Sequence, residues 1–206
     1  MVLNESFRVD GQYVRVLAQH GVDVAQALVC VGLARDTFAQ KEVVMPARAY
    51  LEFMTEVGRQ LSSRASDGRG CSSMRAAIVL ATSEGIETFS APLFAAYCSK
   101  DGMVCLERLA LYKPLVGPLE MDVCQTEDGF VRVTYASAAG QDLPAFFTVC
   151  EYAFLVGLLR AATGEQIRPV ELSIPSVFSS ANSSQVDTSD LEELYDYFGV
   201  YPTAGD

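Results

Sequence analysis

The range 145–163 constrains the fold more than any other part of the sequence, because hydrophobic side chains occur on nearly every side of the helix that it predicts. Asp142 and Pro144 stand at its start and Gly164 at its end, which is typical of helix boundaries. A surface helix carries apolar residues on one stripe, whereas a helix that is apolar all round is buried. We therefore expect this helix to lie in the middle of a domain, with other elements packed around it.

The overall composition indicates a globular protein with an acidic surface. Of the 206 residues 50% are hydrophobic, which suffices for a sizeable core, and 15 basic against 26 acidic side chains give a formal charge of -11. This charge repels the phosphate backbone that supplies most non-specific DNA affinity, so we expect no direct DNA contact. We also expect no membrane-spanning stretch and no signal peptide. The sequence thus predicts a cytoplasmic protein without a membrane partner.

The first half of the chain predicts helices separated by glycines. Asp10 can cap a short helix that Gly21 ends, and Asp23 with Gln26 resembles the capping box of a second helix. Pro46 suits the first turn of a third helix, in which apolar residues recur at helical spacing. We expect this half to be all helix.

A segment poor in apolar residues interrupts this helical half. The range 62–73 is rich in Ser, Gly, Arg and Asp, which predicts a flexible loop that buries almost nothing. The ranges 74–82 and 89–98 then predict two buried helical stretches. Asp101 caps a further helix, which we expect Pro114 to close.

The hydrophobic pattern next changes from a helical to an alternating period. Apolar residues alternate with polar ones over 119–124 and over 131–135, and Asp128-Gly129 supplies a hairpin turn between them. The range 170–174 predicts a third strand. The sequence therefore predicts an α+β fold, a mostly helical domain with a small, largely antiparallel sheet made of the hairpin plus a third strand.

The last helix has clear boundary signals. Ser189 is the predicted cap, Glu192 is its partner in a capping box, and Gly199 ends the helix. Its apolar stripe consists of Leu191, Leu194, Tyr195 and Phe198.

Metal binding and catalysis have little support in the sequence. Six cysteines are scattered without a C-x-x-C pair, mostly among apolar neighbours, which is typical of reduced core residues, and zinc would need clustered Cys or His ligands. The single histidine, His20, lies at a predicted helix end, and phosphate-binding glycine loops are absent. We predict no enzyme activity, no metal and no cofactor. An enzyme would require a cleft that brings His20 beside a cysteine or a serine.

Five segments share their order and pattern with one known family. They are LAQHGVDVAQALVCVGLARDTF with its Gly-hydrophobic-Asp step, the proline-led MPARAYLEFMTEVGRQL, CLERLALYKPLVGPLEMDV, LRAATGEQIRPVELSIP, and DLEELYDYFGVYPTAG with its Tyr-x-x-Phe-Gly signature. In this order they resemble the arabinose-binding-like effector domain that precedes the helix-turn-helix region in one branch of the AraC family of bacterial transcription regulators. Together they cover nearly the whole chain.

The resemblance implies one regulatory, effector-binding domain over 1–206, which senses an unknown small molecule. It implies that DNA is bound only through a helix-turn-helix module located C-terminal to this segment and absent from the chain. The range 68–87 lacks the glycine-rich line that the family often shows. The family's domain usually continues past the Phe-Gly signature through another strand and helix, so we expect an open sheet edge that favours a homodimer or a swapped arrangement. The alternative is an interaction module that dimerises the regulator without any small ligand.

The candidate residues of an effector pocket are aromatic and cationic side chains on elements that we expect to converge. They are Phe53, Tyr97, Arg108, Tyr112, Phe146, Tyr152 and Arg160. The competing interpretation assigns the aromatics to the core and the arginines to the surface, because aromatic side chains commonly dominate cores. Arg160 lies on the otherwise apolar helix, so it emerges into solvent at the helix end, pairs with an acid, or meets an anionic ligand. Of these three we expect solvent exposure.

Overall fold

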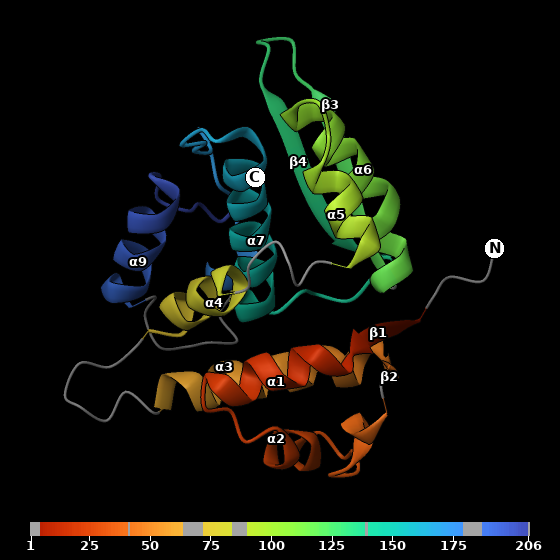
Figure 1. Ribbon diagram of the computed structural model, residues 1–206. Helices are drawn as coiled ribbons and strands as arrows, with labels where there is room; N and C mark the ends of the chain where they lie inside the picture. Colours follow the sequence, from red (N-terminus) through yellow and green to blue (C-terminus); the bar gives the residue numbers. More distant parts are fainter. Residues whose placement is uncertain are drawn as a thin grey trace.

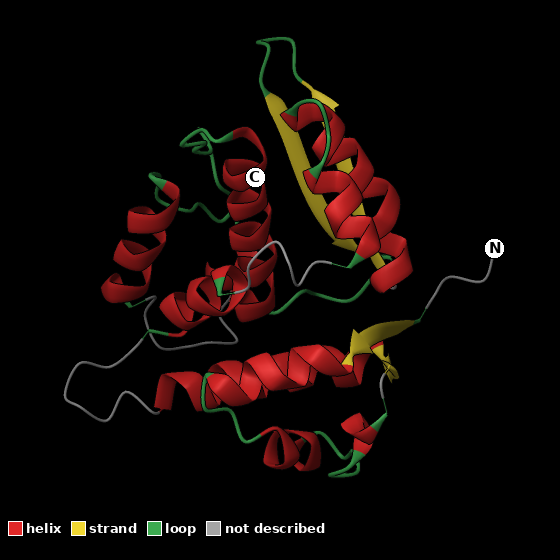
Figure 2. Ribbon diagram, viewed as in Figure 1, coloured by secondary structure: helices red, strands yellow, loops and turns green. Residues whose placement is uncertain are grey.

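The computed structural model describes residues 5–40, 42–63, 72–83, 90–138, 140–178 and 187–205. In chain order the elements are β1 (Ser6–Asp10), α1 (Gly11–Gln19), α2 (Val24–Cys30), the 3-10 turn η1 (Thr37–Ala39), β2 (Glu42–Pro46), α3 (Ala47–Ser63), α4 (Ser73–Thr82), α5 (Ala91–Tyr97), α6 (Gly102–Val116), β3 (Leu119–Gln125), β4 (Val131–Ser137), α7 (Ala145–Thr163), α8 (Pro175–Phe178) and α9 (Thr188–Phe198). Helices dominate this arrangement, and the strands form two separate pairs (Figure 2). The predicted α+β class is confirmed.

The central element is α7 (Figure 1). Two hydrophobic clusters meet on it. The main core combines buried side chains of β1, β2, α1 to α4, α7 and α9, and α7 gives it Phe146, Phe147, Val149, Ala153 and Val156. The second core combines α5, α6, β3 and α7, to which α7 gives Leu155, Leu158 and Leu159. Because α7 faces a core on each side, an apolar residue is needed at almost every position. The prediction that this helix lies in the middle of the domain is confirmed.

By length and composition alone, α7 could also cross a membrane, although we expect no membrane-spanning stretch from the sequence. In the fold, 56% of its apolar window is buried, and its large side chains are shared between the two cores. Both features are those of the core helix of a globular domain.

A two-stranded sheet near the N-terminus corrects the expectation that the first half is all helix. β1 and β2 pair antiparallel, with Phe7 opposite Met45 and Val9 opposite Val43. These four side chains are buried, and the intervening ones are turned outward. Each strand has only five residues, and its partner lies far away in the sequence. The alternation of apolar and polar residues was therefore too short to be recognised as a strand. Pro46 ends β2, and α3 begins at the next residue.

The predicted hairpin is confirmed as β3 and β4, which pair from Leu119 opposite Ser137 to Gln125 opposite Val131. Gly129 has a φ of 84° in the connecting turn, a value that favours glycine. The predicted third strand over 170–174 is wrong. Only one isolated parallel bridge, between Ser173 and Thr203, forms there, because this segment pairs with the end of the chain.

Helix boundaries follow the capping residues closely. Asp23 and Asp101 accept hydrogen bonds from the backbone N–H groups three residues later, as predicted. α6 continues past Pro114 to Val116, because a proline in the last turn removes only one hydrogen bond. The cap of α9 is Asp187, which accepts from the N–H of Ser189, and not Ser189 itself.

Two further expectations concern the segments around α4. α3 extends through Ser63, so the predicted loop over 62–73 begins later than expected. Ser72 caps α4, so the loop also ends earlier than expected. Its central part, 64–71, lies outside the described residues. The start of the predicted helix 89–98 also lies outside them, and α5 covers Ala91–Tyr97.

The contact between α3 and α7 depends on Gly58, where a Cβ atom would lie 2.6 Å from Cδ2 of Phe146. Gly58→Ala should lower the free energy of unfolding by about 1–3 kcal/mol through overpacking, although alanine favours a helix by about 1 kcal/mol. The matched control is Gly102→Ala, whose Cβ would meet Leu159 at an ordinary 3.8 Å. Urea denaturation of both variants checks this, and an unchanged midpoint for Gly58→Ala would contradict the packing.

Candidate functional site

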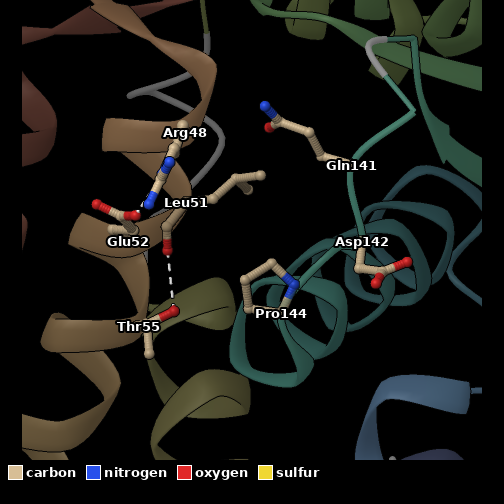
Figure 3. A pocket seen from close by; sticks show the side chains of 7 residues that line it. All are labelled: Arg48, Leu51, Glu52, Thr55, Gln141, Asp142 and Pro144. Atoms are coloured by element: carbon tan, nitrogen blue, oxygen red, sulfur yellow. Dashed lines mark hydrogen bonds and ion pairs between the residues drawn. The ribbon is translucent and has the colours of Figure 1, made fainter. Parts of the chain in front are cut away.

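An open hollow lies between α3 and the loop that leads into α7 (Figure 3). Its volume is about 280 Å³, and it is lined by Arg48, Leu51, Glu52, Thr55, Gln141, Asp142 and Pro144. In Figure 3 the side chain of Leu51 points across the gap toward Gln141 and Pro144. Arg48 and Glu52 lie along α3 on one side, and the carboxylate of Asp142 points away from α3 on the other. We call these seven residues the α3–α7 hollow.

The hollow combines an apolar floor with hydrogen-bonding groups at its edge. Arg48 Nε donates to Glu52 Oε1 at 2.8 Å, and the Thr55 hydroxyl donates to the carbonyl of Leu51 at 2.9 Å. The ion pair is solvated, because 82% of the Arg48 side chain and 48% of the Glu52 side chain are exposed. The hydrogen bond from Arg48 to Glu52 raises the pKa of the guanidinium further. The site offers charged and amide groups to a small polar molecule, and it demands little desolvation of them.

The seven predicted site residues do not line this hollow. Phe53 on α3 and Phe146 on α7 are both buried in the main core. The Phe53 ring lies 5.7 Å from that of Phe38, and the Phe146 ring covers Gly58. For these two aromatics the structure favours the core interpretation.

Three of the predicted residues lie on α5 and α6, beside the second core. Tyr97 is half-buried, with its ring 6.3 Å from that of Phe94. Arg108 donates through Nη1 to the carbonyl of Ala95 at 2.8 Å and to Ser99 Oγ at 3.2 Å, so it supports the end of α5. Tyr112 is half-buried on α6. The assignment of all seven residues to an effector pocket stays a prediction.

Tyr152 belongs to a group of tyrosines around a shielded ion pair where the two cores meet. Lys113 on α6 is paired with Glu151 on α7, and their side chains are only 13% and 19% exposed. The Lys113 ammonium also lies over the ring of Tyr135, 5.4 Å from its centroid, and that ring is 5.5 Å from Tyr152. We call Lys113, Glu151, Tyr135 and Tyr152 the tyrosine junction. It connects α6, β4 and α7.

Burial keeps two phenols and one thiol near the tyrosine junction protonated. Burial, and then the Glu151 carboxylate, raise the pKa of Tyr135 well above its usual value. The same two causes raise the pKa of Cys150 and that of Tyr50. A thiol or phenol with a raised pKa is a poor nucleophile at neutral pH, so these groups do not resemble an activated catalytic site.

Arg160 differs from the expectation that it is exposed at the helix end. It is half-buried, and it donates through Nε to the carbonyl of Ile167 at 2.8 Å and through Nη2 to the carbonyl of Tyr197 at 3.0 Å. Its guanidinium lies 4.7 Å from the centroid of the Tyr197 ring. The Tyr197 hydroxyl in turn donates to the carbonyl of Ala153 at 2.9 Å. Arg160 therefore joins α7 to α9 through neutral backbone acceptors.

The cysteines are more exposed than the sequence analysis expected. Cys30, Cys98 and Cys124 are exposed, Cys150 is intermediate, and Cys105 is buried, while Cys71 lies outside the described residues. All five described cysteines are free thiols. Apolar neighbours in sequence were misleading because, in helices and strands, adjacent residues face different sides.

Groups that would support metal binding or catalysis are not assembled in the part of the chain that the structure describes. No set of three or more His, Cys, Asp or Glu side chains there is placed to hold a metal ion. Within the same ranges, the side chain of His20 forms no hydrogen bond with a cysteine or a serine. The cleft that an enzyme would require around this histidine is therefore not seen among the described residues.

The residues of the α3–α7 hollow were not found by sequence reasoning. Asp142 and Pro144 were noticed only as the start of a helix, and Arg48, Glu52 and Gln141 carry no motif. They meet because the loop before α7 passes α3, which is a tertiary contact without a local signal. A search for exposed polar residues would select them together with many others.

The tyrosine junction generates a test of its ion pair. Lys113→Met leaves the Glu151 carboxylate shielded without its partner, which should lower the free energy of unfolding by about 3 kcal/mol. The double variant Lys113→Met/Glu151→Leu removes both charges and should recover most of this loss. Urea denaturation of both single variants, Lys113→Met and Glu151→Leu, and of the double variant measures the coupling. A loss in the double variant equal to the sum of the two single losses would show that the pair is not coupled.

The contacts of Arg160 generate a second test. Arg160→Met should lower the free energy of unfolding by about 2 kcal/mol, because two charge-assisted hydrogen bonds to carbonyls are lost. Arg132→Met, at an exposed position of β4, is the matched control and should change stability little. Thermal and urea denaturation compare the two variants. A stable Arg160→Met protein would contradict the structural role.

Comparison with known proteins adds one match. A family model described as the arabinose-binding domain of AraC transcription regulators, N-terminal, matches residues 21–182. Among curated proteins the comparison finds no match. The matched range extends from the glycine after α1 to beyond α8, so it contains α7, both sides of the α3–α7 hollow and the tyrosine junction. The chain therefore belongs to the family of N-terminal arabinose-binding domains of AraC transcription regulators.

Proposed function

We propose that this chain senses a small-molecule effector and thereby controls a DNA-binding module located C-terminal to it, as the regulatory domain of an AraC-type regulator. The observation that carries the proposal is the family match over residues 21–182. Sensing domains of this family are not enzymes, which agrees with the protonated thiol and phenols beside the tyrosine junction. We propose a single regulatory domain over 1–206.

The α3–α7 hollow is the place that we propose for the effector. Small-molecule sites combine an apolar surface with a few polar groups that fix the orientation of the ligand. Leu51 and Pro144 supply the apolar surface, and Glu52, Gln141 and Arg48 supply a carboxylate, an amide and a guanidinium. With a volume of about 280 Å³, the hollow suits a molecule at the small end of the usual range. A small polar effector fits these groups better than a long apolar one.

Effector binding can regulate only through a difference in affinity between two arrangements of the protein. The hollow joins α3 to Pro144, the residue that caps α7. A ligand that contacts both sides would favour the arrangement in which the distance between α3 and Pro144 allows both contacts. Because α7 contacts both cores, a shift of its first turn would change the packing of each.

The charge of the domain supports the assignment of DNA binding to another part of the regulator. With a formal net charge of -11 this segment repels DNA, so the phosphate contacts belong to the C-terminal module. The reading frame downstream of Asp206 tests this part of the proposal. A helix-turn-helix segment there is the expected result, and its absence would remove DNA control from the proposal. We place the regulator in the cytoplasm, where DNA is accessible.

A thermal-shift screen with sugars, amino acids and fatty acids tests the sensing function. A cognate effector should raise the melting temperature in a saturable way, since ligand at about 100 times its Kd stabilises a protein by about 2.7 kcal/mol. We expect the hit among the polar compounds. If no compound in an extended polar library stabilises the chain, the sensing function is contradicted.

The location of the site is tested with the same hit. Gln141→Ala and Glu52→Gln should each weaken binding about tenfold, as the loss of one ligand hydrogen bond predicts. Gln125→Ala and Glu120→Gln, at exposed positions of β3, are matched controls and should bind as the wild type does. Calorimetric titration gives the Kd values. Unchanged affinity in both hollow variants would place the effector elsewhere.

A further inference from the structure

α9 is attached to the rest of the domain more by polar contacts than by burial. It lies against α4 and α7 (Figure 1), and of its 11 residues, all of them described, two are buried, Leu194 and Phe198. By contrast, α7 buries nine of its 19 side chains. The ion pair between Arg75 on α4 and Glu193 has side chains that are 59% and 29% exposed, so it adds little stability. An element with few buried apolar contacts opens at a lower free energy than the core does.

One tyrosine of α9 lies in a slot on the surface of α7. The Tyr197 hydroxyl donates to the carbonyl of Ala153 at 2.9 Å, and the Arg160 guanidinium covers the ring, 4.7 Å from its centroid. Between these two contacts, a Cβ atom at Gly157 would lie 3.3 Å from the Tyr197 hydroxyl oxygen. Because of their spacing, residues 153, 157 and 160 share one face of the helix. We call Ala153, Gly157 and Arg160 the Tyr197 slot, which has room for this ring because position 157 carries no side chain.

The residues that follow α9 are attached beside the same slot. The Thr203 N–H donates to the carbonyl of Leu172, and the Ile174 N–H donates to the carbonyl of Thr203, both at 2.9 Å. These two bonds connect the segment after α7 with the residues after α9. Arg160 also connects both parts, because it donates to the carbonyl of Ile167 and to a carbonyl of α9. One arginine of α7 therefore holds the whole attachment together.

Contacts between α9 and residues 199–205 make them a single unit. The rings of Tyr195 and Tyr201 stack with their centroids 4.6 Å apart, and the Tyr201 hydroxyl donates to Glu192 Oε1 at 3.2 Å. Gly199 ends α9 with a φ of 83°, the left-handed conformation that turns the chain back onto the helix. None of these contacts involves α7, so α9 and the residues after it can separate from α7 together.

From these contacts we infer that α9 and residues 199–205 form a C-terminal latch, which leaves the Tyr197 slot as one unit while the middle of α7 stays folded. A closed latch fixes the place at which a C-terminal DNA-binding module would be attached, and an open latch frees it. This role in regulation rests on the proposed function. Because α7 borders the hollow at Pro144, a ligand there can bias the latch if it binds the closed and open forms with different affinities.

Native-state hydrogen exchange at low, rising urea concentrations tests whether the latch opens separately. The probes are the amides of Thr203 and Ile174, whose hydrogen bonds connect the latch to its neighbour, and the backbone amides of α9. An isolated helix of 11 residues is marginal in water, so α9 also loses protection when the latch opens. We call these probes the latch amides. They should exchange about 100-fold faster than amides in the middle of α7 or more, with one common, weak urea dependence, because a local opening exposes little surface.

Removal of a single hydroxyl tests whether the Tyr197 slot holds the latch. Tyr197→Phe loses the hydrogen bond to Ala153, and it should speed the exchange of the latch amides about tenfold. Tyr201→Phe is the matched control, because it removes the same atom from an exposed bond to Glu192 within the latch itself. Exchange of the latch amides in this control should equal that of the wild type.

Gly157→Ala fills the Tyr197 slot without changing Tyr197 or Arg160. The added Cβ atom crowds the Tyr197 hydroxyl, so the latch amides should exchange faster by a similar factor. Alanine favours a helix more than glycine does, so α7 itself should not be weakened. Circular dichroism of the variant should match that of the wild type, which separates latch opening from misfolding.

Four results would overturn the inference. They are latch amides with the exchange and urea dependence of the middle of α7, fast exchange confined to Thr203 and Ile174 while α9 stays protected, unchanged exchange in both Tyr197→Phe and Gly157→Ala, and equal acceleration in Tyr201→Phe. Failure of these tests would leave a thermal-shift hit, and with it the sensing function, intact. A screen without a hit would contradict sensing without changing the exchange of the latch amides. The two claims therefore fail separately.

Discussion

The burial of α7 on all its sides is the constraint on which the other elements depend. Its residues divide between the main core and the second core, so neither cluster is complete without it. α3 can approach α7 closely because Gly58 leaves room for the Phe146 ring. On the other side, the Lys113–Glu151 pair ties α6 to α7 where the tyrosines of both cores meet. The single chain thus forms two clusters around one shared helix.

The sequence predicted elements whose signals are local and missed those that depend on distant partners. α7, the β3–β4 hairpin and the aspartate caps of α2 and α6 are determined by neighbouring residues, and all were predicted. The β1–β2 pair joins two five-residue strands separated by α1 and α2, and its alternation was too short to be recognised. The range 170–174 has the composition of a strand, but its strand-like pairing is limited to a single bridge from Ser173 to Thr203.

The candidate site was less predictable than the fold for a related reason. Large aromatic residues attract attention in a sequence, yet Phe53 and Phe146 are required by the main core. A cation on an apolar helix was expected to be exposed to solvent or to bind an anion. Arg160 instead donates hydrogen bonds to two backbone carbonyl groups that are brought to it only in the folded chain. The hollow is formed by common polar residues such as Gln141, brought to α3 by the course of a loop. Family membership was predictable because it depends on the order of many helix ends.

The position of α7 gives the domain a rigid connection between two remote regions. Pro144 at its first turn borders the hollow, and Arg160 near its last turn holds the carbonyl of Tyr197 in α9, close to the end of the chain. A helix of 19 residues is about 28 Å long, so the hollow and the contact with α9 lie at opposite ends of one continuous element. A displacement of the first turn along the helix axis would therefore reach Arg160 and the carbonyl of Tyr197 that it holds.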